Sequence, residues 1–207
     1  MSRQGDLFAG DALASGASRP AAAPPLLRHQ LLAWQERVAA HQAPLFARQD
    51  AAPAEQGLLF AAASSTAPTA ADDPAAAAAG LDPLALAPQS LSFWRWPSAP
   101  HQGAALYLVI DRPPDPAPPL LLYVGETGRA DRRWKGDHDC KAYLAAYGEA
   151  LAVANLTARL SIRFWLDVPA AIGPRRALEQ ALIRRWLPPF NKETRGRWTT
   201  PFTADPT

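Results

Sequence analysis

A change in composition near residue 90 limits what this chain can fold into. Residues 61–90 consist mostly of Ala, Pro, Ser, Thr and Asp, and residues 9–25 are similar. Such segments bury too little apolar surface to offset the conformational entropy that is lost on ordering. We therefore expect residues 1–90 to form a largely disordered tail. Residues 91–207 are expected to form one compact domain, since they suffice for a single core.

One segment of the tail departs from this composition. Apolar side chains recur at helical spacing from Leu26 to Val38, which predicts a helix over about residues 25–41. Two interpretations stay open at this point: an amphipathic helix that docks on another surface, or a marginal helix without a function of its own.

The charge of the chain is divided unevenly between its halves. Residues 101–207 carry 15 Lys and Arg against 11 Asp and Glu, whereas residues 1–100 carry 6 against 8. The single cysteine, Cys140, excludes a disulfide scaffold and fits a reducing compartment. No apolar run suits secretion, and none approaches the roughly 20 residues of a membrane span. We expect a soluble cytoplasmic protein that does not associate with membranes.

The second half contains apolar runs and helical segments in an order that predicts an α+β fold. Residues 105–110 and 120–124 are short apolar runs bounded by turn residues, which is typical of buried strands. Apolar and polar side chains alternate over 160–166, as in a half-buried strand. Helices are expected over 129–136, over 139–153, and between Gly173-Pro174 and Pro188-Pro189.

A pentapeptide pattern occurs three times in the first half. Each copy has Gln at its first position and Leu-Phe at its last two, and Ala follows each copy. Two adjacent apolar anchors on an extended polar segment suit a preformed pocket on another protein. The copies are defined by Gln4, Leu7 and Phe8, by Gln42, Leu45 and Phe46, and by Gln56, Leu59 and Phe60.

The pattern resembles the clamp-binding motif of bacterial replication and repair proteins, Gln-x-(Ser/Asp)-Leu-Phe. Asp6 fits the third position of the first copy, whereas Pro44 and Leu58 depart from it in the other two. The resemblance implies recruitment to a bacterial sliding clamp, where several copies would raise avidity on a ring of equivalent pockets. The alternative is that the copies pin the tail to the domain.

Five residues of the second half follow one another at characteristic spacings. Tyr107 lies within the first strand, and Tyr123 opens a Tyr-Val-Gly sequence at the end of the second. Arg133 comes ten residues after Tyr123, and Asn191 twelve residues after Glu179, which lies on the last helix. This order resembles the GIY-YIG nuclease family over about half of the chain. The resemblance implies a small three-stranded antiparallel sheet flanked by helices, and a metal-dependent endonuclease that acts on DNA in repair or recombination.

The resemblance also implies roles for individual residues. Tyr107 would accept a proton from the attacking water, and Arg133 would bind the scissile phosphate and stabilise its developing charge. Gly125 would let the backbone approach a phosphate closely. The remaining site residues on this basis are Tyr123, Glu179 as the metal ligand, His138 as an auxiliary group, and Asn191, which either bridges the final segment to the site or makes a purely structural bond.

The position of Glu179 on its helix points to a cation from the residues alone. On a helical wheel, Glu179 projects within the apolar arc of Leu182, Ile183 and Trp186. An ionised carboxylate is costly to bury without a cation beside it. An Arg partner and a metal ion are the two alternatives. An oxygen ligand together with a phosphate substrate indicates Mg²⁺ or Mn²⁺.

Basic side chains close to these residues suit contacts with DNA phosphates. Two departures from the family pattern, Ala105 in the first strand and Glu126 directly after Gly125, leave a second function open. In that reading the chain is a non-catalytic DNA-binding adaptor on a decayed nuclease fold. The candidate DNA contacts are Arg132, Lys135, Arg195 and Arg197, and the same basic region contains Arg175, Arg176, Arg184, Arg185, Trp186 and Trp198.

Overall fold

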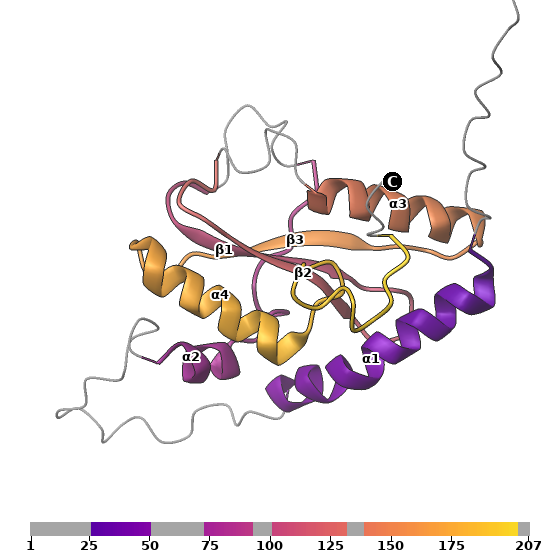
Figure 1. The fold of residues 1–207 in the computed structure, drawn as a ribbon, viewed down its shortest axis with the longest axis horizontal. Coiled ribbons are helices and arrows are strands. Elements are labelled where there is room, and N and C mark those ends of the chain that lie inside the picture. Colours follow the sequence, from indigo (N-terminus) through magenta and orange to yellow (C-terminus); the bar gives the residue numbers. More distant parts are fainter. Residues whose placement is uncertain (1–25, 51–72, 93–100, 132–138, 203–207) are drawn as a thin grey trace, which may run out of the picture.

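A three-stranded antiparallel sheet lies at the centre of the fold, with helices on both of its faces (Figure 1). The structure, a computed structural model, describes residues 26–50, 73–92, 101–131 and 139–202. The strand order is β2-β1-β3, and the predicted α+β class with three antiparallel strands is confirmed. The strands are β1 (Ala105–Asp111), β2 (Leu120–Thr127) and β3 (Leu160–Trp165).

The central strand is apolar along most of its length because both of its faces are covered. Every residue of β1 is buried. Tyr107 and Val109 point into the core on the side of α3 (Asp139–Val153), whereas Leu108 and Ile110 point into the core on the opposite side. That second core is closed by α2 (Pro74–Gly80) and α4 (Ile172–Trp186).

Helix α1 (Arg28–Asp50) runs along the outer side of β2 and joins the two cores (Figure 1). Leu31, Trp34 and Val38 from its first half are buried in the core on the α3 side. Phe46 near its end is buried in the core on the α4 side. The helix predicted over about 25–41 is therefore longer than expected and forms part of the domain.

The segment before β1 also belongs to this domain. Gln89 pairs with Ile162 at the outer edge of β3 through two backbone hydrogen bonds of 2.8 and 3.0 Å. Arg163 on β3 donates to the carbonyl oxygens of Leu84 and Leu86 at 2.7 and 2.5 Å. The predicted boundary near residue 90 is therefore wrong, because residues 28–50 and 74–92 bury side chains and satisfy strand edges within the same fold.

The outer edge of β2 is completed by two side-chain amides in place of a fourth strand. Leu121 donates its backbone N–H to Gln42 Oε1 at 2.8 Å and accepts from Gln42 Nε2 at 2.9 Å. Val124 makes the same pair of bonds with Asn191, at 3.0 and 2.8 Å. An open strand edge would leave such backbone groups unpaired or available to another chain. Gln42 and Asn191 therefore close this edge.

The second Gln-x-x-Leu-Phe copy is thus part of the domain. Gln42 has no exposed surface, and the ring centroid of Phe46 lies 4.6 Å from that of Trp186. Leu45 is partly buried against the same core. A clamp pocket cannot reach these side chains, so the expectation that this copy binds a clamp is wrong. The copies at Gln4–Phe8 and Gln56–Phe60 lie outside the described residues.

None of the helices in the described part of the chain combines the length and the apolar character that crossing a membrane requires.

Candidate active site

Two tyrosines from neighbouring strands meet at the end of β2. Tyr107 of β1 stands opposite Gly125 of β2 in the register of the sheet. The ring of Tyr123 is stacked beside that of Tyr107, with 5.9 Å between centroids and 25° between planes. The two hydroxyl groups share a hydrogen bond. Tyr107 is fully buried and Tyr123 is half-buried, so Tyr123 is the more accessible member of the pair.

Gly125 makes room for this pair. A Cβ atom at this position would overlap the phenol ring of Tyr107. We expected Gly125 to allow a phosphate to approach the backbone, but the structure fills that space with the Tyr107 ring. The absence of a side chain at Gly125 is therefore a packing requirement of the tyrosine pair.

The Tyr123 hydroxyl holds its proton firmly. Burial is the main reason that its pKa lies above the ordinary value, and the proximity of Tyr107, Cys140 and Glu179 adds to the shift. Its hydrogen bond to Tyr107 acts in the same direction. A phenol that keeps its proton is a hydrogen-bond donor, and donation to a neighbouring oxygen favours negative charge on that oxygen. Tyr123 can therefore stabilise an ionised Tyr107.

Glu179 of α4 brings a carboxylate to the same end of β2. It accepts a hydrogen bond from the backbone N–H of Glu126. The pKa of the Glu179 carboxyl is raised from 4.5 to about 7, mainly by burial and also by the nearby charges of Glu126 and Glu193, against the opposing effects of the Glu126 N–H and Arg176. The helix buries Leu178, Leu182, Ile183 and Trp186 around it, as the wheel predicts.

Glu126 is neutralised by two arginines. Arg175 donates from Nε to Glu126 Oε2 at 2.8 Å, and Arg176 lies 3.5 Å from the other carboxylate oxygen. Arg175 also donates to the carbonyl oxygens of Pro169 and Ala170, at 3.1 and 2.6 Å. Its side chain is only 4% exposed. Arg175 is therefore an internal partner of Glu126, and the expectation that it contacts DNA is wrong.

Arg175 and Arg176 pair with Glu126, and within the described segments neither forms an ion pair with Glu179. Among the described residues, no Lys, Arg or His lies within 4.0 Å of its carboxylate, so the predicted Arg-partner alternative for Glu179 is not seen there. Sequence reasoning did not identify the Arg175–Glu126 pair, because the two residues are 49 positions apart and no local pattern links them.

Asn191 positions β2 and its tyrosine. Both polar atoms of its amide are used by the backbone of Val124, which follows Tyr123 directly, and Asn191 is 4% exposed. Phe190 adds a bond from its backbone N–H to Leu122 O at 3.0 Å. Of the two roles left open for Asn191, the structure therefore supports the structural bond.

Among the described residues of this site, Glu179 is the carboxylate that could serve as an oxygen ligand for a metal ion. Within the described segments, no three His, Cys, Asp or Glu side chains form a group that could hold a metal ion. Mg²⁺ commonly binds through one or two carboxylates together with waters and substrate phosphates. Glu179 supplies one half-buried carboxylate of this kind, and no ion pair to it is seen in the part of the chain that the structure describes.

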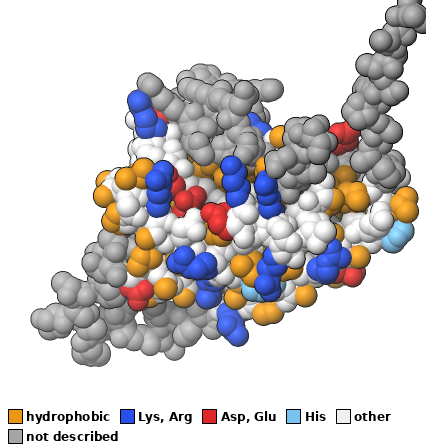
Figure 2. Space-filling model, viewed as in Figure 1, with side chains coloured by type: hydrophobic (Ala, Val, Ile, Leu, Met, Phe, Trp, Pro, Cys, Tyr) orange, Lys and Arg blue, Asp and Glu red, His pale blue; other side chains and the backbone are white. Residues whose placement is uncertain are grey.

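Basic side chains surround the acidic ones on the face that α4 crosses (Figure 2). Arg195 is half-buried and donates to the hydroxyl of Tyr143 at 3.3 Å. Arg197 is exposed and lies 5.5 Å from the ring centroid of Trp198. Trp186 and Trp198 are buried, so neither ring is available to stack on a base. Of the other predicted contacts, Arg132, Arg133, Lys135 and His138 lie outside the described residues.

Comparisons of the chain with protein-family models, curated proteins and solved structures found no match. The resemblance to GIY-YIG nucleases therefore depends on the residues of this site alone.

Proposed function

We propose that this chain is a metal-dependent DNA endonuclease of the GIY-YIG type. One observation supports the proposal above all others: a hydrogen-bonded pair of phenols lies next to a half-buried carboxylate that has no ion-pair partner among the described residues. These residue types, on these elements, are the ones from which the resemblance predicts a phosphodiester-cleaving site.

In this proposal, Tyr107 takes the proton from the attacking water. An unperturbed phenol ionises only near pH 10, so Tyr107 needs groups that stabilise its negative form. The Tyr123 hydroxyl supplies one such group by donating its hydrogen bond. A divalent ion, when bound, supplies positive charge that stabilises the phosphate oxygens and the phenolate, and Glu179 would hold it. Arg133 is proposed to neutralise the scissile phosphate.

The sharpest test is a cleavage screen with a conservative variant of the carboxylate. The full chain is incubated with branched, flapped, nicked and damaged DNA in Mg²⁺ or Mn²⁺. Glu179→Gln keeps the shape of the side chain and should abolish cleavage, whereas Glu149→Gln makes the same change at an exposed position of α3 and should not. If wild-type protein cuts no substrate, or if Glu179→Gln cuts as fast as wild type, the proposal is wrong.

A second function is favoured by the complete burial of Tyr107. A proton acceptor without access to water cannot take part in hydrolysis. If Tyr107 and its neighbours only pack the core, the protein would bind DNA without cutting it. This adaptor function predicts DNA affinity in the same screen with no turnover under any metal condition. Cleavage that Glu179→Gln abolishes excludes it.

Recruitment by a sliding clamp is proposed for the two copies of the motif that lie outside the described residues. The copy at Gln4, Leu7 and Phe8 fits the consensus best. A peptide of residues 1–12 should bind a bacterial clamp, and Phe8→Ala should abolish that binding because it removes an apolar anchor. If the peptide does not bind, or if Phe8→Ala binds equally well, the proposal of clamp recruitment is wrong. The nuclease proposal is not affected by that result.

A further inference from the structure

An arginine-lined pocket lies at the opposite end of the central strand from the tyrosine pair. Its volume is about 390 Å³, within the range of about 300–1,000 Å³ that is common for small-molecule sites. Arg112 follows β1 directly and is five residues beyond Tyr107. At about 3.3 Å per residue, the pocket begins on the order of 16 Å from the candidate active site. The polar residues that line it are Arg112, Asp115, Arg159, Ser161 and Arg163.

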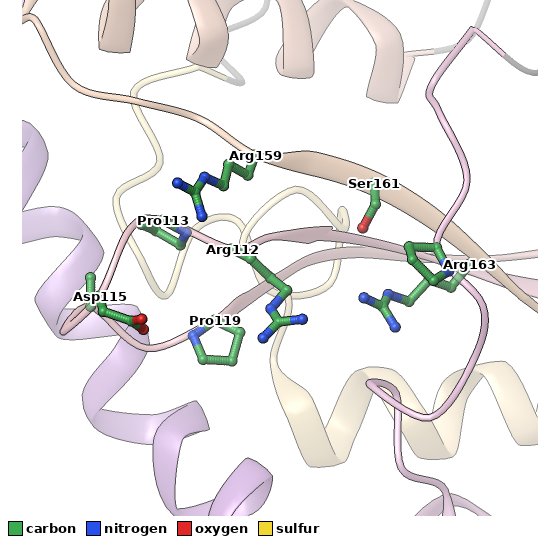
Figure 3. A pocket seen from close by; sticks show the side chains of 9 residues that line it. Arg112, Pro113, Asp115, Pro119, Arg159, Ser161 and Arg163 are labelled. Atoms are coloured by element: carbon green, nitrogen blue, oxygen red, sulfur yellow. The ribbon is translucent and has the colours of Figure 1, made fainter.

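The guanidinium groups of Arg112 and Arg163 point toward one another in this pocket (Figure 3). The hydroxyl of Ser161, on the same strand as Arg163, points into the space between them (Figure 3). Arg159, the residue before β3, adds a third guanidinium to the lining. The pocket therefore presents hydrogen-bond donors from two strand ends around one space.

Arg163 is fixed in place by the fold. Its residue is 2% exposed, and its Nη1 donates to the carbonyl oxygens of Leu84 and Leu86. Its Nε is buried without a hydrogen-bond partner in the described structure. Burial lowers the pKa of the Arg163 guanidinium, and the like charge of Arg112 lowers it further, whereas Asp82 acts in the opposite direction. In the described part of the chain, the positive charges of Arg163 and Arg112 are therefore not fully balanced by nearby negative charge.

Arg112 and Arg159 are available to a ligand. Both are exposed, and neither side chain has a hydrogen-bond or ion-pair partner among the residues that the structure describes. Among the described residues that line the pocket, Asp115 is the acidic one, and Asp82 adds a carboxylate near Arg163. Within this described part of the chain, three guanidinium groups therefore face two carboxylates, and the surplus is positive.

We propose that this pocket is a phosphate-binding site. Guanidinium groups present forked donors that match the oxygens of a phosphate, and a hydroxyl donor between two of them suits a tetrahedral anion with several acceptors. The phosphate belongs to a free phosphate compound such as pyrophosphate or to the backbone of a nucleic acid. The site is separate from the tyrosine pair, so the proposal does not depend on the nuclease activity.

The test compares two double variants of the full chain that remove the same charge. Arg112→Gln/Arg159→Gln changes the pocket. Arg37→Gln/Arg48→Gln changes two exposed arginines of α1 that do not line it. Binding of inorganic pyrophosphate is measured by calorimetry and binding of a short DNA duplex by fluorescence anisotropy, both at low ionic strength because exposed charges are screened by salt. The circular dichroism of each variant checks that it is folded.

The pocket variant should weaken binding by about 10- to 100-fold, as expected for lost hydrogen bonds between charged groups, and the α1 variant by less than about threefold. Ser161→Ala should weaken it by a smaller factor without a change of charge. A selective loss of pyrophosphate binding identifies a free phosphate compound as a sufficient ligand, and a selective loss confined to the duplex identifies the nucleic-acid backbone. If neither probe binds, or if both double variants weaken binding equally, the proposal is overturned.

Discussion

The phenol ring of Tyr107 occupies the space that a side chain on Gly125 would need. The two residues face each other across β1 and β2, so neither can move without disturbing the sheet. We therefore expect Gly125→Ala to lower the free energy of unfolding by about 1–3 kcal/mol, the usual cost of overpacking a core. Urea denaturation of the variant and the wild type measures the difference.

A second glycine provides the matched control. Gly148 lies within α3, and a Cβ atom there would meet nothing within 4 Å. Gly148→Ala should raise stability by about 0.5–1 kcal/mol, because Ala is the better helix former. In a Tyr107→Leu background the cost of Gly125→Ala should shrink, since the overlapping ring is gone. An unchanged cost in that background would show that the ring is not the cause.

The raised pKa of the Glu179 carboxyl predicts a pH-dependent stability. Between pH 4.5 and about 7, the folded protein keeps a proton that the unfolded chain has already lost. This favourable contribution is complete below pH 4.5 and disappears as the pH rises through about 7. Glu179→Gln removes the burial cost of the charge, so in the presence of EDTA it should be more stable than wild type by about 1–2 kcal/mol at pH 8.5, a value discounted for partial solvent screening.

The same two proteins should differ little at pH 4.5, where the wild-type carboxyl is protonated in the folded state. Thermal unfolding at the two pH values measures both differences. Glu149→Gln, exposed on α3, controls for the loss of a surface charge. A stability gain of Glu179→Gln that is equal at both pH values would contradict the assignment of the effect to the buried charge.

The hydrogen bond between the two phenols predicts different outcomes for their Phe variants. Tyr107→Phe should reduce cleavage by about 100-fold or more, because it removes the proposed proton acceptor. Tyr123→Phe leaves that acceptor but removes the donor that stabilises its negative form, so cleavage should fall less and its pH profile should move to higher pH.

The measurement for this pair is the initial cleavage rate between about pH 6 and pH 10. Tyr143→Phe is the control, since Tyr143 lies on α3, not on the strands of the phenol pair, and, among the described residues, its hydroxyl accepts a bond of 3.3 Å from Arg195. A Tyr123→Phe profile that keeps the wild-type midpoint would show that Tyr123 contributes packing alone.

The strands and the last helix were predictable because their signals are local. The apolar run that contains Tyr107 indicates a buried strand, and Pro174 in the first turn of α4 and Pro188-Pro189 after its end indicate where the helix begins and stops. The meeting of Tyr107, Tyr123 and Glu179 was also predictable, but only through the resemblance, since spacing alone does not say which strands pair. The place of Gly125 against the Tyr107 ring depends on that pairing, and no local pattern indicates it.

The role of α1 could not be predicted from the sequence. The Ala- and Pro-rich segments on either side of it led us to expect that the whole first half is a disordered tail. The helical spacing of Leu31, Trp34 and Val38 is visible in the sequence, but the surface that these residues cover is not. Gln42 reads as the first residue of a recruitment motif, yet its partner Leu121 is 79 positions away. A buried amide and an exposed recognition amide look the same in a sequence, and only the neighbouring strand edge distinguishes them.

Gln42 therefore provides the last prediction. Gln42→Ala leaves the N–H and C=O of Leu121 and the C=O of Trp186 buried without partners. We expect the free energy of unfolding to fall by about 3 kcal/mol or more, because each buried unpaired group costs about 1–3 kcal/mol. Gln102→Ala removes an exposed amide before β1 and should change stability by less than about 0.5 kcal/mol. Denaturant unfolding of both variants tests whether Gln42 stabilises the domain. If Gln42 were instead a clamp-binding residue in a flexible tail, Gln42→Ala would unfold at the same denaturant midpoint as the wild type.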